Sequence, residues 1–194
     1  VSMSPMTSFG GGDGWLTGAE LSILGTNATR SIAYSRASGN LYVATRDGGT
    51  SVRILDASSG LEIGALDTGR VSGGFFAINM IGADDDGAIY GANLTLEANT
   101  NAFKVYKWDS DIFPPNIVYE GIPALFGATL SGGRLGDTFD VTGSGNNVRV
   151  AAGYANTAIT EDNTYALIAP NIDPFLATGT AITFGNPAPA QGAF

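Results

Sequence analysis

The fold is decided by residues 41–60, which read LYVATRDGGTSVRILDASSG. Two runs rich in apolar and β-branched residues, 41–45 and 52–56, flank the turn sequence DGG at 47–49, and the turn SSG at 58–60 follows. Apolar runs of this length, bounded by Gly, Asp and Ser, predict β-strands joined by tight turns. The stretch therefore predicts an antiparallel hairpin that continues into further strands.

The same layout occurs three times along the chain. Leu41, Ile89 and Val148 occupy equivalent places after the first turn of each copy, at spacings of 48 and 59 residues. A single four-stranded sheet cannot bury its faces alone, so neighbouring copies must stack on one another. The repeat predicts an all-β, β-propeller-like chain of about three four-stranded antiparallel blades, with partial strands at both ends and an incomplete ring.

We expect the strands of the three blades at 31–34, 41–45, 52–56 and 61–66, at 76–81, 89–92, 103–108 and 117–119, and at 138–141, 148–152, 165–168 and 181–184. We expect one domain over 1–194, divided into an N-terminal segment (1–29), blade 1 (30–70), blade 2 (71–121), blade 3 (122–185) and the start of a further blade or a linker (186–194). The run AELSIL at 19–24 is interpreted as a lone outer strand within the N-terminal segment.

Three blades do not close a ring, since propellers have about four to eight. Either the chain is a fragment of a longer propeller, or its open edges are filled by other copies. Unpaired edges favour association, and a head-to-tail contact that does not close makes a filament. We therefore expect self-association or other protein chains as partners.

Composition limits the function. The chain has 194 residues, of which 44% are hydrophobic, 14% are charged and 28 are glycine, and it has no cysteine and no histidine. These absences exclude cysteine zinc sites, thiol nucleophiles, Ser-His-Asp triads and imidazole bases. A net charge of −9 argues against nucleic acid as a partner, and no apolar stretch is long enough to span a membrane.

Asp84, Asp85 and Asp86 form the densest acidic cluster and are candidate ligands for Ca²⁺, which prefers carboxylate and carbonyl oxygens. However, Asp and Gly are also what a tight hairpin requires. The cluster precedes Gly87 at the place where the other copies have SGN turns. A turn is therefore the favoured interpretation, and no other cofactor is expected.

Two tripeptides match the N-glycosylation sequon, beginning at Asn27 and Asn93. The tripeptide also arises by chance, so both asparagines are candidates for a modification that intact mass would detect.

Five charged residues fall in segments that a propeller places on one loop face: Arg46, Asp47, Arg70, Arg134 and Asp137. Converging charges at such a face are a candidate ligand site. The favoured alternative is that these arginines and aspartates pair with one another and tie the loops together.

Several stretches resemble bacterial secreted β-propeller domains of unassigned function. The resemblance is carried by residues 30–34, 41–49, 52–60, 103–108 and 134–141. It implies an extracellular or cell-surface location, and it brings no catalytic residues with it.

These observations predict an extracellular, non-catalytic structural or interaction protein built on propeller blades, which assembles through open edges into a filament or surface structure. The alternative is a carbohydrate-binding or glycan-processing module that uses the loop face. A third class, a metal-dependent enzyme, would need carboxylate ligands alone. Fold-level analogy does not choose among them.

Overall fold

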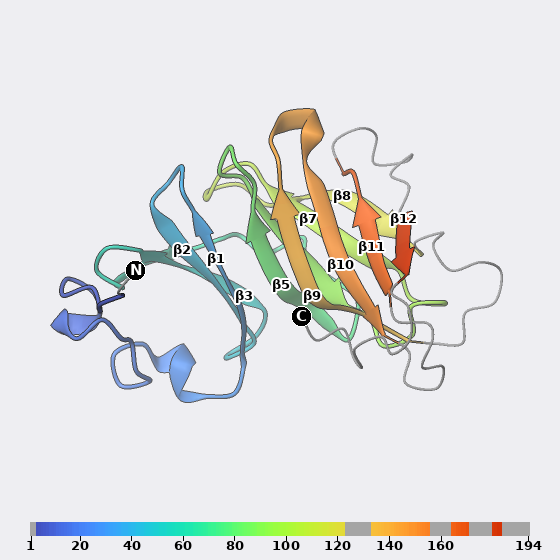
Figure 1. Cartoon of the computed structure of the whole chain (residues 1–194). Coiled ribbons are helices and arrows are strands. Elements are labelled where there is room, and N and C mark those ends of the chain that lie inside the picture. The colour runs from blue at the N-terminus through green and yellow to red at the C-terminus, as the bar shows by residue number, and fades with distance from the viewer. Residues whose placement is uncertain (1–2, 123–132, 156–163, 171–179, 184–194) are drawn as a thin grey trace.

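A computed structural model describes residues 3–122, 133–155, 164–170 and 180–183, and these form three four-stranded antiparallel sheets (Figure 1). Sheet 1 comprises β1 (Thr29–Ser35), β2 (Asn40–Thr45), β3 (Ser51–Asp56) and β4 (Glu62–Ala65). Sheet 2 comprises β5 (Phe76–Ala83), β6 (Ile89–Leu94), β7 (Phe103–Trp108) and β8 (Asn116–Gly121). Sheet 3 comprises β9 (Arg134–Thr142), β10 (Arg149–Ala155), β11 (Thr164–Ile168) and β12 (Thr180–Thr183). The strands of each sheet pair in chain order, so the predicted all-β chain of three meanders is confirmed.

Helical structure in the described residues is restricted to short 3-10 turns, η1 (Gly10–Gly12), η2 (Ser22–Gly25) and η4 (Gly145–Asn147). Within those same residues we find no helix with the length and apolarity that crossing a membrane requires.

The strand predicted at 19–24 is wrong, because this segment forms turns and part of η2 and does not pair as a strand with any sheet in the described residues. The Glu20 carboxylate accepts hydrogen bonds from both the backbone N–H and the hydroxyl of Thr17, at 2.8 Å each, and the chain then enters η2. Leu21 and Ile23 are nevertheless buried, and they pack with Val43 and Leu55 on the outer face of sheet 1. The apolar residues of this run therefore cover that face without forming a strand.

Sheets 1 and 2 stack face to face through an apolar layer. Trp108, at the end of β7, is 1% exposed and belongs to this layer, and its indole N–H donates to the Asp67 carbonyl at 2.8 Å. The buried side chains of the layer are Tyr42, Ala44, Val52, Ile54, Leu66, Ile78, Ile81, Ile89, Tyr106 and Trp108. Burial on this scale is what holds one sheet against the next.

Sheets 2 and 3 stack through a second apolar layer on the other face of sheet 2. Its buried side chains include Tyr90, Phe103, Tyr119, Leu135 and Tyr154. The Phe103 and Tyr119 rings lie 6.4 Å apart between centroids, a separation typical of packed aromatic pairs. Burial raises the pKa of the Tyr119 hydroxyl to about 12, as expected for a phenol removed from water.

Strand β6 lies between these two layers, and all six of its residues are buried. Ile89 belongs to the layer with sheet 1, whereas its neighbour Tyr90 belongs to the layer with sheet 3. A Cβ added at Gly91 would lie 3.0 Å from the Trp108 ring and 3.1 Å from Ile78. The absence of a side chain at Gly91 thus leaves room for large side chains from its neighbours.

The first strands of the three sheets, β1, β5 and β9, lie against one another in succession (Figure 1). Asn79 of β5 is fully buried and links them: its Oδ1 accepts from Nε of Arg30 in β1 at 2.8 Å, and its Nδ2 donates to the Gly136 carbonyl of β9 at 2.7 Å. Satisfying both ends of a buried amide fixes how the three strands align.

Candidate functional site

The turns that join the first and second strands of each sheet meet at one end of the molecule, which we call the turn end. Gly87, in the β5–β6 turn, lies so close to sheet 1 that an added Cβ would be 2.5 Å from Cβ of Ala37. On the other side, the Asp85 N–H donates to the Gly143 carbonyl at 2.9 Å, and the Gly145 N–H donates to the Asp86 carboxylate at 3.0 Å. The three turns therefore form one continuous surface.

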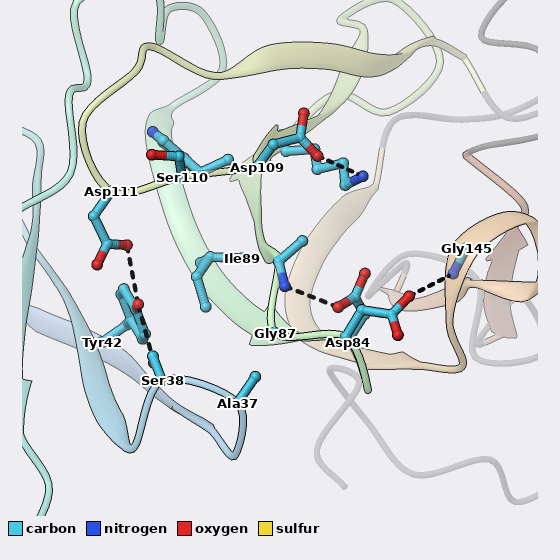
Figure 2. Close-up of a pocket in the computed structure, with 14 residues that line it drawn as sticks. Ala37, Ser38, Tyr42, Asp84, Gly87, Ile89, Asp109, Ser110, Asp111 and Gly145 are labelled. Carbon is cyan, nitrogen blue, oxygen red and sulfur yellow. Dashed lines mark hydrogen bonds and ion pairs between the residues drawn. The ribbon is translucent and has the colours of Figure 1, made fainter.

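A pocket of about 470 Å³ opens in this surface (Figure 2). Sheet 1 contributes Ser38 and Tyr42, and the turn of sheet 2 contributes residues 84 and 86–88. The connection from β7 to β8 contributes residues 109–111, and sheet 3 contributes Gly145. The pocket thus exists only because the three sheets stack, which brings together segments distant in sequence.

Four carboxylates line the pocket, and each has one oxygen with an identified partner. Asp84 accepts from the Ala88 N–H at 2.9 Å, and Asp86 accepts from Gly145. Asp111 accepts from the Tyr42 hydroxyl at 3.0 Å, as Figure 2 shows. A carboxylate offers about four acceptor sites, so each retains capacity for an added donor.

Lys107 supplies the cation of the pocket, and its ammonium group lies 2.6 Å from the Asp109 carboxylate. Partial burial lowers the pKa of Lys107, but the hydrogen bond and charge of Asp109 outweigh it, so the net shift of this pKa is upward. Burial also raises the pKa of the Tyr42 hydroxyl, and Asp111 adds to that shift. At neutral pH the pocket therefore holds a charged ammonium, a neutral phenol and four carboxyl groups.

The Ca²⁺ candidates Asp84, Asp85 and Asp86 do not converge on a common point. Asp84 is 6% exposed and caps its own turn, whereas Asp86 reaches across to sheet 3. In the part of the chain that the structure describes, no three acidic side chains are placed to hold a metal ion. The Asp84 and Asp86 carboxylates instead accept hydrogen bonds from backbone N–H groups, an arrangement common in turns.

The residues assigned to the loop face lie at the opposite end of the sheets, which we call the loop end. Arg134 and Asp137 form an ion pair within β9, with Nε and Oδ2 2.5 Å apart, and the hydrogen bonds of Asp137 raise the pKa of Arg134. Arg46 instead stacks on the Phe76 ring, and Arg70 is exposed. Among the described residues, Asp47 forms no ion pair with Arg46. Among these five residues, the ion pair that the described part of the chain shows joins two residues of the same strand and does not tie one loop to another.

The Asn93 sequon cannot be used in the folded chain. Asn93 is fully buried in β6, where its Nδ2 donates to the Ala102 carbonyl at 3.1 Å and its Oδ1 accepts from the Lys104 N–H at 2.9 Å. The amide that would carry the sugar therefore holds the β6–β7 loop together. Asn27 is exposed and remains a candidate for modification.

Sequence reasoning missed Tyr42, Lys107, Asp109 and Asp111 as residues of a site. The available signal was topological: in a meander, the connection between the third and fourth strands lies at the same end as the turn between the first and second. Residues 109–111, which read DSD, follow the third strand of sheet 2 and so belong with the acidic turn at 84–86.

Comparison with known proteins shows a related fold. No protein-family model and no curated protein sequence match this chain. The crystal structure of a DUF4623 family protein from Bacteroides eggerthii matches with a TM-score of 0.67 at 19% sequence identity. The match covers 88% of this chain but only 39% of that chain. At this identity the likeness shows the fold alone.

Proposed function

We propose that this chain is a non-catalytic interaction protein, located outside the cell, whose turn-end pocket binds a cationic group of a partner. The observation that carries the proposal is the charge of the pocket, where four carboxylates and a single ammonium group share one hollow. Carboxylates that already bond to backbone or phenol are held in place before a ligand arrives, which reduces the entropy that binding costs.

We also propose that the three sheets are consecutive blades of a β-propeller-like scaffold. Three features support this arrangement: each sheet is a four-stranded meander, neighbouring sheets stack face to face, and the first strands of all three lie together. Radial stacking of such meanders is how propellers protect their sheet edges. A rigid scaffold of this kind serves binding by presenting its turns and loops.

A guanidinium group is the cation that fits the pocket best. Its planar fork offers five N–H donors, which suits carboxylates that two separate connections of sheet 2 bring to the same pocket. Ser38, Tyr42 and Ser110 add hydroxyl groups along the wall. The apolar atoms of Ile89 and Trp108 in the lining suit the methylene stem of an arginine side chain.

Binding is tested with a blocked tripeptide that carries arginine in the middle, compared with the same peptide carrying glutamine. Isothermal titration should show saturable binding of the arginine peptide that weakens as salt is added. Replacing Asp111→Asn or Asp109→Asn removes a charge-assisted acceptor, so each should weaken binding by about tenfold or more.

The matched control is Asp47→Asn, which removes the same charge at the loop end and should leave the affinity unchanged. Equal affinity for the glutamine peptide, or an equal loss in the Asp47→Asn variant, would show that the pocket does not recognise a cation.

Non-catalysis is proposed from the sequence, which lacks histidine and cysteine. Self-association into a filament stays a prediction, and so does carbohydrate processing.

A further inference from the structure

Two arginines converge on one aromatic ring at the loop end. The guanidinium carbon of Arg46 lies 3.7 Å from the centroid of the Phe76 ring, and that of Arg30 lies 5.3 Å from the same centroid. The two positive groups are therefore at most about 9 Å apart, whatever their directions, and each is half-buried. Like charges at this separation repel, so their closeness requires an explanation.

Neither arginine has a carboxylate partner in the described residues. The ion pairs found there use Arg53, Lys104, Lys107 and Arg134 instead. The Arg30 Nε donates to the neutral amide of Asn79, and the Arg46 Nε is buried without a hydrogen-bond partner in that part of the chain. This lack of counter-charge is unusual in a chain with 18 acidic and nine basic residues.

The two arginines are held in place by the fold. Asn79 anchors Arg30 and is itself bonded to the Gly136 carbonyl, so Arg30 is fixed relative to all three first strands. The Arg46 backbone N–H donates to the Ala28 carbonyl at 3.1 Å, which ties the end of β2 to the residue that precedes β1. Stacking on Phe76 accounts for where Arg46 lies, but it leaves the buried Nε of the guanidinium without an acceptor in the described residues.

An exposed apolar surface lies beside these charges. The ring of Phe75 is 60% exposed, and its centroid is 4.6 Å from that of Phe76. A sugar ring that carries a carboxylate matches both features, because its C–H face packs on an aromatic ring while its carboxylate accepts from guanidinium groups. We propose that Arg30, Arg46 and Phe75 form a binding site for uronic acid residues of an acidic saccharide.

This site is distinct from the turn-end pocket. Phe76 and Asp84 are eight residues apart along β5 and its following turn, which places them roughly 25 Å apart at about 3.3 Å per residue. The two sites also have opposite charge, so each can be tested without disturbing the other.

The test uses a trimer of galacturonic acid and, as the neutral counterpart, a trimer of galactose. Titration calorimetry should show saturable binding of the galacturonate trimer at low salt and weaker binding of the neutral trimer. Arg46→Gln should weaken binding of the acidic trimer by about tenfold or more, as expected for the loss of charge-assisted hydrogen bonds. Arg46→Lys should also weaken it, because a lysine keeps the charge but loses the planar fork. Phe75→Ala should weaken binding of both trimers.

Arg36→Gln is the control, since Arg36 is an exposed arginine in the β1–β2 turn and its replacement changes the net charge equally. Its affinity for the acidic trimer should equal that of the unaltered chain. Each variant is checked for an unchanged thermal unfolding midpoint, which matters most for Arg30→Gln because Arg30 supports Asn79. Absence of saturation by the galacturonate trimer at millimolar concentration, an equal loss in Arg36→Gln, or tighter binding of an oligoglutamate peptide than of the saccharide would overturn the proposal.

Discussion

Replacing Trp108 with alanine should lower the free energy of unfolding by about 3–5 kcal/mol, the range found when a large buried aromatic residue is truncated in a packed core. Trp108 is buried in the layer between sheets 1 and 2, and its N–H is satisfied by the Asp67 carbonyl. The substitution leaves a cavity against Gly91 and Ile78, and it leaves that carbonyl without its donor. Urea denaturation followed by circular dichroism measures the change.

Trp15→Ala provides the matched control, because Trp15 is 69% exposed in the N-terminal segment. Its substitution should change stability by no more than about 0.5 kcal/mol. Similar losses from the two substitutions would mean that Trp108 does not fill a layer between sheets.

Replacing Gly136 with alanine should cost about 3–5 kcal/mol, which combines backbone strain with a clash. Gly136 in β9 has a φ of +99°, which L residues rarely adopt, and an added Cβ would lie 2.3 Å from the Asn93 carbonyl oxygen and 2.9 Å from the Phe103 ring. The strand must therefore move away from sheet 2, which also disturbs the hydrogen bond from Asn79.

Gly39→Ala separates these two costs. Gly39 also has a positive φ, of +72°, but nothing lies within 4 Å of its added Cβ. The Gly39→Ala variant should therefore lose only about 1 kcal/mol of unfolding free energy, which is the cost of the backbone conformation. An unfolding free energy that falls equally in the two variants would contradict the close approach of β9 to β6.

The strands could be predicted because their signals are local. Turn residues bound each apolar run, and the equivalence of Leu41, Ile89 and Val148 locates the second strand of every sheet. The prediction of a strand at 19–24 was wrong, because the Glu20 carboxylate accepts from the backbone N–H and hydroxyl of Thr17 and the chain then enters η2.

The candidate sites could be predicted less well, because they depend on which residues the stacking brings together. The sequon at Asn93 is a property of three residues, whereas its burial follows from the position of β6 between two apolar layers. Similarly, Asp111 is recognised as a site residue only through its hydrogen bond with Tyr42 of another sheet, and Arg46 only through its stacking on Phe76 of another sheet. Contacts between sheets have no signature in a short stretch of sequence.

The central claim is that the three meanders stack face to face in chain order, and an engineered disulfide tests it most directly. A Cβ built at Gly82 of β5 lies 3.1 Å from Cβ of Val141 in β9, close to the separation of about 3.5–4.5 Å that a disulfide requires. The chain has no cysteine, so the variant Gly82→Cys/Val141→Cys can form only the designed bond within one molecule. In the control Gly82→Cys/Asp140→Cys, the second cysteine is shifted by one residue to the opposite face of β9. Intact mass and thiol titration after mild oxidation should show an intramolecular bond in the first variant and free thiols in the control. Free thiols in both variants, or bonds formed equally in both, would contradict the stacking of sheets 2 and 3.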